Sequence, residues 1–100
     1  MIVQISAEAE RDLEAIGDFI AMDNPERAIS FIRELRAKCL TLAEFPERFP
    51  VVPRYMSQGI RRRLHANYLI FYRIFAETVI VLHVLHGAQD YEALLDDPAR

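Results

Sequence analysis

The chain has 100 residues, the length of one domain, which excludes a large enzyme with separate cofactor and substrate domains. Its composition, 52% hydrophobic and 27% charged with three Gly and five Pro, is that of a folded globular protein and excludes an intrinsically disordered one. The formal net charge of −3 argues against a protein that grips nucleic acid by itself, because each phosphate contact needs a Lys or Arg.

The first half of the chain predicts one strand and two helices. The β-branched residues of 2–5 favour a short strand. Ser6 is a suitable N-cap for a helix over 7–22, whose apolar stripe is Ala9, Leu13, Ile16 and Ile20. Pro25 suits the first position of a second helix over 25–44, whose stripe is Ala28, Ile32, Leu35, Cys39 and Leu42. The short connection predicts an antiparallel helical hairpin.

The second half of the chain predicts strands. A loop is expected over 45–58, because helix cannot continue through Pro46, Pro50 and Pro53. After Gly59 the hydrophobic period becomes two, which predicts three strands over residues 60–65, 68–75 and 79–86. Asp90 can cap a last short helix that runs through Leu95, and residues 96–100 are expected to form a tail.

These elements predict the α+β fold class. Their order is β-α-α-β-β-β with a short C-terminal helix, in a single domain over residues 1–95. We expect the helical hairpin to pack on one face of a small, largely antiparallel sheet. The opposite face is expected to be partly open, which would leave it available for function.

Few residues carry a chemical signal of their own. The sequence has no phosphate-binding Gly-rich loop, no metal-ligand spacing and no nucleophile motif, so no cofactor or metal is expected. Cys39 lies on an apolar helical stripe and is expected to be a buried, inert thiol. His83 and His86 are three apart in a predicted strand and therefore point to opposite faces. Although His65 could join either one across the sheet, we expect ordinary hydrogen-bonded histidines.

The sequence also bears on localisation. A single cysteine cannot form an internal disulfide, and residues 1–5 lack the basic and apolar regions of a signal peptide. The most apolar window, 79–85, is far shorter than the ~20 residues of a membrane span. We therefore expect a soluble, cytoplasmic protein that does not bind membranes.

Three consecutive arginines are the sharpest charge feature. On a strand, Arg61 and Arg63 share one face and Arg62 takes the other. They either protect an edge strand from pairing with another sheet or form a docking surface for acidic groups, and the sequence leaves both interpretations open. Tyr91 follows the break at Gly87 and is expected to be partly exposed.

Four stretches, in order and with compatible spacing, carry a resemblance to a known family. They are residues 6–16, 24–28, 59–73 (Gly59-Ile-Arg61-Arg62 followed by Asn67-Tyr68-Leu-Ile-Phe71-Tyr72-Arg73) and 84–87 (Val84-Leu85-His86-Gly87). Over about residues 2–95 the chain resembles the RelE/ParE toxin superfamily, and most closely its ParE-like members from type II toxin–antitoxin systems.

The resemblance implies one of two activities. RelE-like members cut messenger RNA in the ribosomal A site. ParE-like members bind DNA gyrase and stabilise its cleaved-DNA complex, which is inhibition by binding rather than enzyme chemistry. Both are neutralised by a cognate antitoxin, here expected to be ParD-like, whose C-terminal segment wraps the toxin.

Two positions favour the gyrase branch. RelE-like nucleases carry arginines where this chain has Leu69 and residues 88–89, and neither position here supplies the positive charge that phosphate cleavage needs. Gln89 also departs from ParE-like sequences, which often have Arg-Asp there. The alternatives therefore remain a RelE-like ribosome-dependent endonuclease, with Tyr91 as its one candidate catalytic residue, or a degenerate, non-toxic antitoxin-binding member. We expect no direct sequence-specific nucleic-acid binding, and the candidate contacts with target or antitoxin are Arg61, Arg63, Arg73 and Tyr91.

Overall fold

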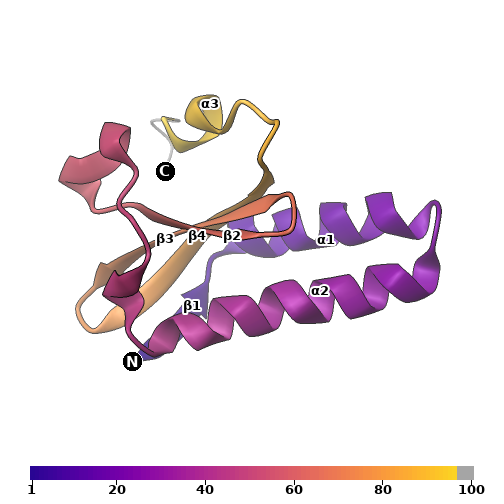
Figure 1. Cartoon of the computed structure of the whole chain (residues 1–100), viewed down its shortest axis with the longest axis horizontal. Coiled ribbons are helices and arrows are strands. Elements are labelled where there is room, and N and C mark those ends of the chain that lie inside the picture. Colours follow the sequence, from indigo (N-terminus) through magenta and orange to yellow (C-terminus); the bar gives the residue numbers. More distant parts are fainter. Residues whose placement is uncertain (97–100) are drawn as a thin grey trace.

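A computed structural model describes residues 1–96 and shows the predicted order of elements (Figure 1). The strands are β1 (Ile2–Ile5), β2 (Arg61–His65), β3 (Tyr68–Phe75) and β4 (Thr78–His86), and the helices are α1 (Ala7–Ala21), α2 (Pro25–Leu40) and α3 (Tyr91–Leu95). Short 3₁₀ turns span Thr41–Ala43, Pro46–Arg48 and Pro53–Gln58. The α+β prediction is confirmed.

The sheet has the strand order β1-β4-β3-β2. β1 runs parallel to β4, and the other two neighbouring pairs are antiparallel. The prediction of a largely antiparallel sheet is therefore confirmed. β2 forms one edge, and the backbone of Val51 bridges to Arg61 along part of it.

Both long helices begin at the predicted caps. The Ser6 hydroxyl accepts from the Ala9 amide (3.0 Å) and donates to the Leu82 carbonyl (3.1 Å), so it also ties α1 to β4. The Asn24 side chain accepts from the Arg27 amide (3.0 Å). The second α-helix ends at Leu40, four residues before the predicted end at 44, because its last turn tightens into a 3₁₀ turn over Thr41–Ala43.

The main core lies between the helical hairpin and one sheet face. Its buried side chains come from α1, α2 and the inner strands: Ala9, Leu13, Ile16, Phe31, Leu35, Cys39, Leu42, Ile70, Tyr72, Val79, Val81 and Val84. Figure 1 shows α1 and α2 side by side on this face, extending beyond the end of the sheet. The predicted packing of the hairpin is confirmed.

The opposite sheet face is more covered than the sequence suggested. A second cluster of buried side chains lies there: Val52, Tyr55, Ile60, Phe71 and Leu85, with Tyr91, Leu94 and Leu95 of α3 packed against it. Figure 1 shows the 3₁₀ turn Pro53–Gln58 and α3 over this side of the sheet. The expectation of a partly open face missed that two short segments carry apolar anchors.

The end of the described chain is held in place. The Asp96 carboxylate, at the end of α3, accepts from Arg54 Nη2 (2.7 Å). The rest of the predicted 96–100 tail lies outside the described residues. Among residues 1–96, no helix is both long enough and apolar enough to cross a membrane.

Candidate functional site

Arg61 lies on the edge strand β2 and holds the proline-containing segment against the sheet. Its Nη1 donates to the carbonyl oxygens of Glu47 (2.9 Å) and Phe49 (2.7 Å). The Arg62 amide donates to the Pro50 carbonyl (3.1 Å) of the same segment. Because a charged donor makes stronger hydrogen bonds than a neutral one, Arg61 has a structural role whatever else it binds.

Arg63 ties the end of α2 to the sheet. Its Nη1 donates to the Lys38 carbonyl (3.1 Å) and to the Thr41 hydroxyl (2.8 Å). Its guanidinium lies over the Phe49 ring, 4.7 Å from the centroid. Burial and, secondarily, the neighbouring Arg48 charge lower the pKa of Arg63 from its ordinary value. Arg63 thus joins the Thr41 hydroxyl (3.1 Å) in hydrogen bonding to a carbonyl in the last turn of the helix.

Arg62 and Arg73 differ from these two, because their guanidinium groups make no ion pair or hydrogen bond with any residue of 1–96. Arg73 lies over the ring of Phe75, 5.3 Å from its centroid. Both belong to the face opposite α1 and α2, whereas Arg61 and Arg63 face the helices. Arg61, Arg63 and Arg73 therefore do not form one strip, and Arg62, which sequence reasoning left aside, is one of the available cations.

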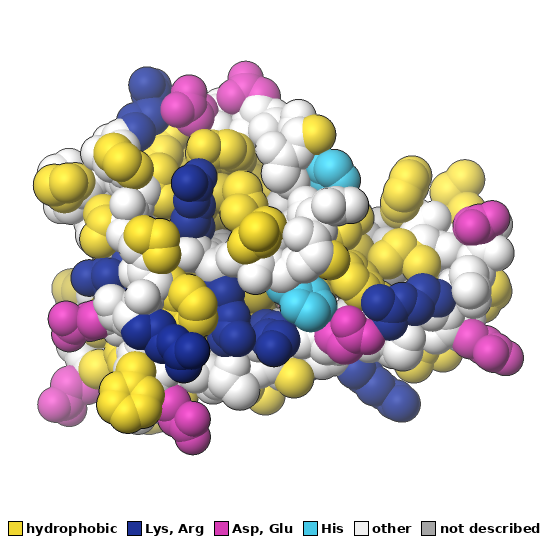
Figure 2. Space-filling model, viewed as in Figure 1, with side chains coloured by type: hydrophobic (Ala, Val, Ile, Leu, Met, Phe, Trp, Pro, Cys, Tyr) yellow, Lys and Arg dark blue, Asp and Glu magenta, His cyan; other side chains and the backbone are white. Residues whose placement is uncertain are grey.

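Lys and Arg side chains gather at the centre of the face shown in Figure 2, over β2 and the segment before it. This acidic protein therefore has a basic area on one face. Its individual arginines divide between structural and available roles, a division that strand periodicity alone could not reveal.

Tyr91 lies at the start of α3 and packs onto the sheet. Its ring is 5.0 Å from that of Phe71, centroid to centroid. Arg54 holds the other end of the helix through Asp96 and lies 3.9 Å from a Glu92 carboxylate oxygen. The Arg54 hydrogen bond lowers the pKa of Asp96 below its ordinary value. The half-buried Tyr91 is thus an anchor of α3 as well as a candidate contact.

A cavity of about 620 Å³ lies beside α3 on the same side of the sheet. Its apolar lining includes Ile60, Ile80 and Leu82, and Arg54 and Arg73 also line it. Of the predicted contact residues, Arg73 lies in the lining of this cavity.

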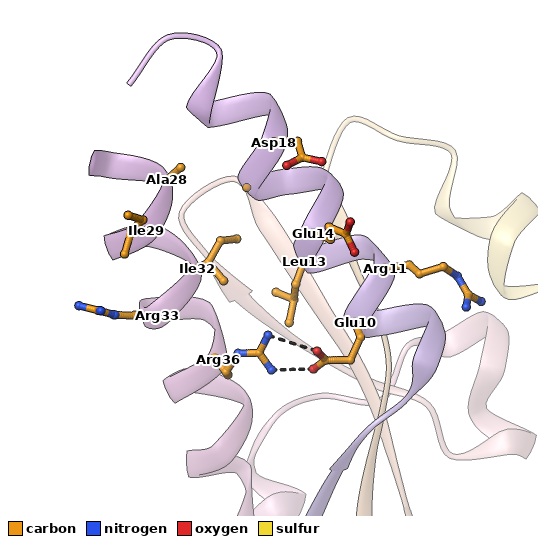
Figure 3. Close-up of a pocket in the computed structure, with 11 residues that line it drawn as sticks. Glu10, Arg11, Leu13, Glu14, Asp18, Ala28, Ile29, Ile32, Arg33 and Arg36 are labelled. Carbon is orange, nitrogen blue, oxygen red and sulfur yellow. Dashed lines mark hydrogen bonds and ion pairs between the residues drawn. The ribbon is translucent and has the colours of Figure 1, made fainter. Parts of the chain in front are cut away.

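A groove of about 600 Å³ runs between α1 and α2 (Figure 3). Leu13 and Ile32 lie between the helices, and the Glu10 carboxylate bridges to Arg36 across the groove at 2.6 Å. The helices are close at Gly17, where an added Cβ would be 3.3 Å from Ile32 Cγ1. Sequence analysis did not single out this groove, although the spacing of four between Glu10, Glu14 and Asp18 marks its acidic wall.

The histidines and the cysteine are as expected. His83 is buried and hydrogen-bonded to Asp12 (2.6 Å), and His65 pairs with Glu34 (3.2 Å). Within residues 1–96, no cluster of His, Cys, Asp and Glu could hold a metal ion. Cys39 is fully buried, and burial raises the pKa of its thiol to about 11.

Comparison with known proteins decides the family. The sequence matches the family model described as the ParE toxin of the type II toxin–antitoxin system, parDE, over residues 3–91. The chain belongs to the ParE toxin family. A solved structure titled "Chromosomal ParDE TA system from P. aeruginosa" is similar with a TM-score of 0.75, covering 86% of this chain and 95% of that chain. At 19% identity this likeness shows the fold alone. No curated protein sequence matches.

Leu69 and Gln89, the two positions that the sequence analysis compared with arginines of RelE-like nucleases, carry neutral side chains. Leu69 is partly buried and packs against the second cluster. Gln89 Oε1 accepts from the His86 amide (2.8 Å), so its side chain caps the turn after β4. Neither residue places a cation on the surface.

Proposed function

We propose that this ParE-family toxin acts in the cytoplasm by binding DNA gyrase and stabilising its cleaved-DNA complex. The observation that carries the proposal is the state of Leu69 and Gln89, one packed on an apolar cluster and the other capping a turn. An RNA-cleaving site needs groups that stabilise the charge developing on phosphate. Together with the ParE family assignment, this favours inhibition by binding over bond chemistry.

The candidate contacts with an acidic partner fall on two faces. Arg73, beside the cavity next to α3, has a free guanidinium among the described residues, and Tyr91 is half-buried nearby on α3. Arg61 and Arg63 add positive charge at the β2 edge. Arg61 also holds the segment of residues 47–49 through its carbonyls, and Arg63 holds the end of α2. We assign Arg73 and Tyr91 to direct contact, and Arg61 and Arg63 to steering the encounter.

The second partner is a ParD-like antitoxin. Its C-terminal segment would lay an amphipathic helix and extended chain along the apolar surface of the helical hairpin, in the helix-in-groove mode. Acidic antitoxin residues would meet the arginines, which would speed association more than it would add affinity. Rates against immobilised antitoxin, measured over ionic strength, test this: charge reversal at Arg61 and Arg63 together should slow association and flatten its salt dependence.

The activity is tested with purified protein in two assays. Gyrase with supercoiled plasmid should accumulate linear DNA with protein bound to its ends when the toxin is added. A translating ribosome extract should show no new cuts in messenger RNA. Codon-specific cuts that disappear in Tyr91→Ala would instead support the endonuclease alternative. Antitoxin binding without either activity would identify a degenerate, non-toxic member.

A further inference from the structure

The two edges of the sheet differ in how they are protected from pairing with another chain. β2 carries three consecutive arginines, and the segment before it bonds to its outer side through the Val51 bridge and the Arg62 amide. β1, at the other edge, has the sequence Ile-Val-Gln-Ile, without a charge, a proline or a glycine. Charges and covering segments are what usually keep an edge strand from pairing, so β1 is the less protected edge.

The backbone of β1 has hydrogen-bonding groups that point away from the sheet. The Ser6 amide, directly after the strand, donates to the Val81 carbonyl of β4 (3.0 Å). Because these groups alternate between the two sides of a strand, Gln4 directs its own to β4, and Val3 and Ile5 direct theirs outward. Neither Val3 nor Ile5 makes a backbone hydrogen bond on that outer side with any residue of 1–96. Each therefore offers one donor and one acceptor to a further strand.

The side chains of β1 also leave this edge accessible. Val3 and Ile5 point to the helix face, where they are only partly buried against the main core. Ile2 and Gln4 point to the opposite face, where Gln4 is exposed and Ile2 is 70% exposed. A strand added at this edge would cover the outer flanks of Val3 and Ile5, and it would meet no charged side chain of β1.

We propose that β1 pairs with β1 of a second copy of the chain, antiparallel and about a two-fold axis that passes beside Gln4. In this register Val3 of each copy lies opposite Ile5 of the other, and the residues of each such pair exchange backbone hydrogen bonds. The outward groups of the strand are thus satisfied by the same groups of its copy, as a two-fold interface requires. The main cores of the two copies then meet across the axis through Val3 and Ile5.

The side chain of Gln4 favours a copy over an unrelated extended segment. Since its own backbone groups are directed to β4, the two Gln4 residues form the non-hydrogen-bonded pair on the axis, where opposed side chains are closest. A carboxamide has both donors and an acceptor, so two of them can bond to each other in a two-fold arrangement. A charged residue at this position would repel its own copy. Because β1 is only four residues long, the association is expected to be weak and reversible.

Sedimentation of the purified full-length chain, with no residues added before Met1, tests the proposal. The mass should move from one copy towards two as concentration rises, and added salt should change the dissociation constant little, because the paired strands carry no charge. Gln4→Lys and Gln4→Glu should each raise the dissociation constant about fivefold or more, since like charges then face each other across the axis. Gln58→Lys, at an exposed glutamine of the 3₁₀ turn Pro53–Gln58, is the matched control and should leave it unchanged.

An equimolar mixture of Gln4→Lys and Gln4→Glu separates the proposed contact from misfolding. In the mixed pair opposite charges meet on the axis, so the mixture should regain association although each variant alone does not. Amide hydrogen exchange locates the contact: the Val3 and Ile5 amides should exchange more slowly as concentration rises. A mixture that does not regain association, or a dimer in which these two amides exchange at an unchanged rate, overturns the proposal. A chain that stays monomeric at every concentration also overturns it and leaves this edge to an extended segment of another protein.

Discussion

The Asp12 carboxylate on α1 accepts a hydrogen bond from Nδ1 of the buried His83 on β4, 71 positions away in sequence, at 2.6 Å. The same Asp12 oxygen accepts from the Val84 amide (3.0 Å). β1 pairs with β4 only as far as Val81, so the side of β4 beyond it has no neighbouring strand. Beyond the end of β1, the Asp12 carboxylate thus accepts the hydrogen bond of a β4 amide, and in doing so it binds the helical hairpin to the sheet.

Asp12→Ala should destabilise the fold strongly. It removes the acceptor of two donors that are shielded from water, and each unsatisfied donor costs about 1–3 kcal/mol. We expect the free energy of unfolding to fall by about 2–4 kcal/mol in urea titrations. Asp18→Ala, on the same helix but exposed, should change it by less than about 0.5 kcal/mol. Equal effects of the two substitutions would contradict the role assigned to Asp12.

The adjacent arginines 62 and 63 should differ in their contribution to stability. Arg63→Ala removes donors to the end of α2 and to Thr41, so the free energy of unfolding should fall by about 1–3 kcal/mol. Arg62→Ala removes no such bond within residues 1–96 and should stay within about 0.5 kcal/mol. Both are measured by chemical denaturation with circular dichroism. A larger loss for Arg62→Ala would show that the structural role is wrongly divided.

The docking of α3 should depend on pH through Asp96. Its carboxyl has a pKa lowered from 3.8, chiefly by the hydrogen bond from Arg54. A lowered folded-state pKa contributes stability that is present above 3.8 and is lost as pH falls through the folded value. Nuclear magnetic resonance shifts of the α3 amides should therefore be steady above this range and move below it. In Asp96→Asn this acid-dependent step should disappear; if it persists, another group controls α3.

Cys39 should be nearly unreactive in the folded protein. With the pKa of its thiol raised to about 11 by burial, only about a thousandth is thiolate at pH 8. A thiol reagent should modify the native protein slowly, faster as pH rises, and at the ordinary cysteine rate after unfolding in urea. Rapid modification of the native protein at pH 8 would show that the second helix opens readily.

The hydrophobic periods predicted every strand and long helix, because the face that a side chain occupies follows directly from the geometry of helix or strand. Caps were equally readable, since Ser6 and Asn24 bond to amides three residues away. The end of the second helix could not be predicted in this way, because a side chain distant in sequence takes part in it: Arg63 donates a hydrogen bond to the Lys38 carbonyl.

The candidate site follows from the sequence less directly than the fold does. The sequence suggested Arg61, Arg63, Arg73 and Tyr91 as contacts. In the structure, Arg61 and Arg63 donate to carbonyls and a hydroxyl of the chain itself. The covered sheet face was also missed, since Tyr55 and Tyr91 belong to segments too short to show a period.

The sequence by itself determined the element order, the α+β class and the inward faces of the two long helices, because these follow from bonds and periods within a few residues. Only the tertiary structure decided which arginines are free, what covers the second face and which charges line the hairpin groove. Those properties depend on partners such as Arg63 and Lys38, 25 positions apart, and a guanidinium is available or occupied only after the chain has brought such partners together.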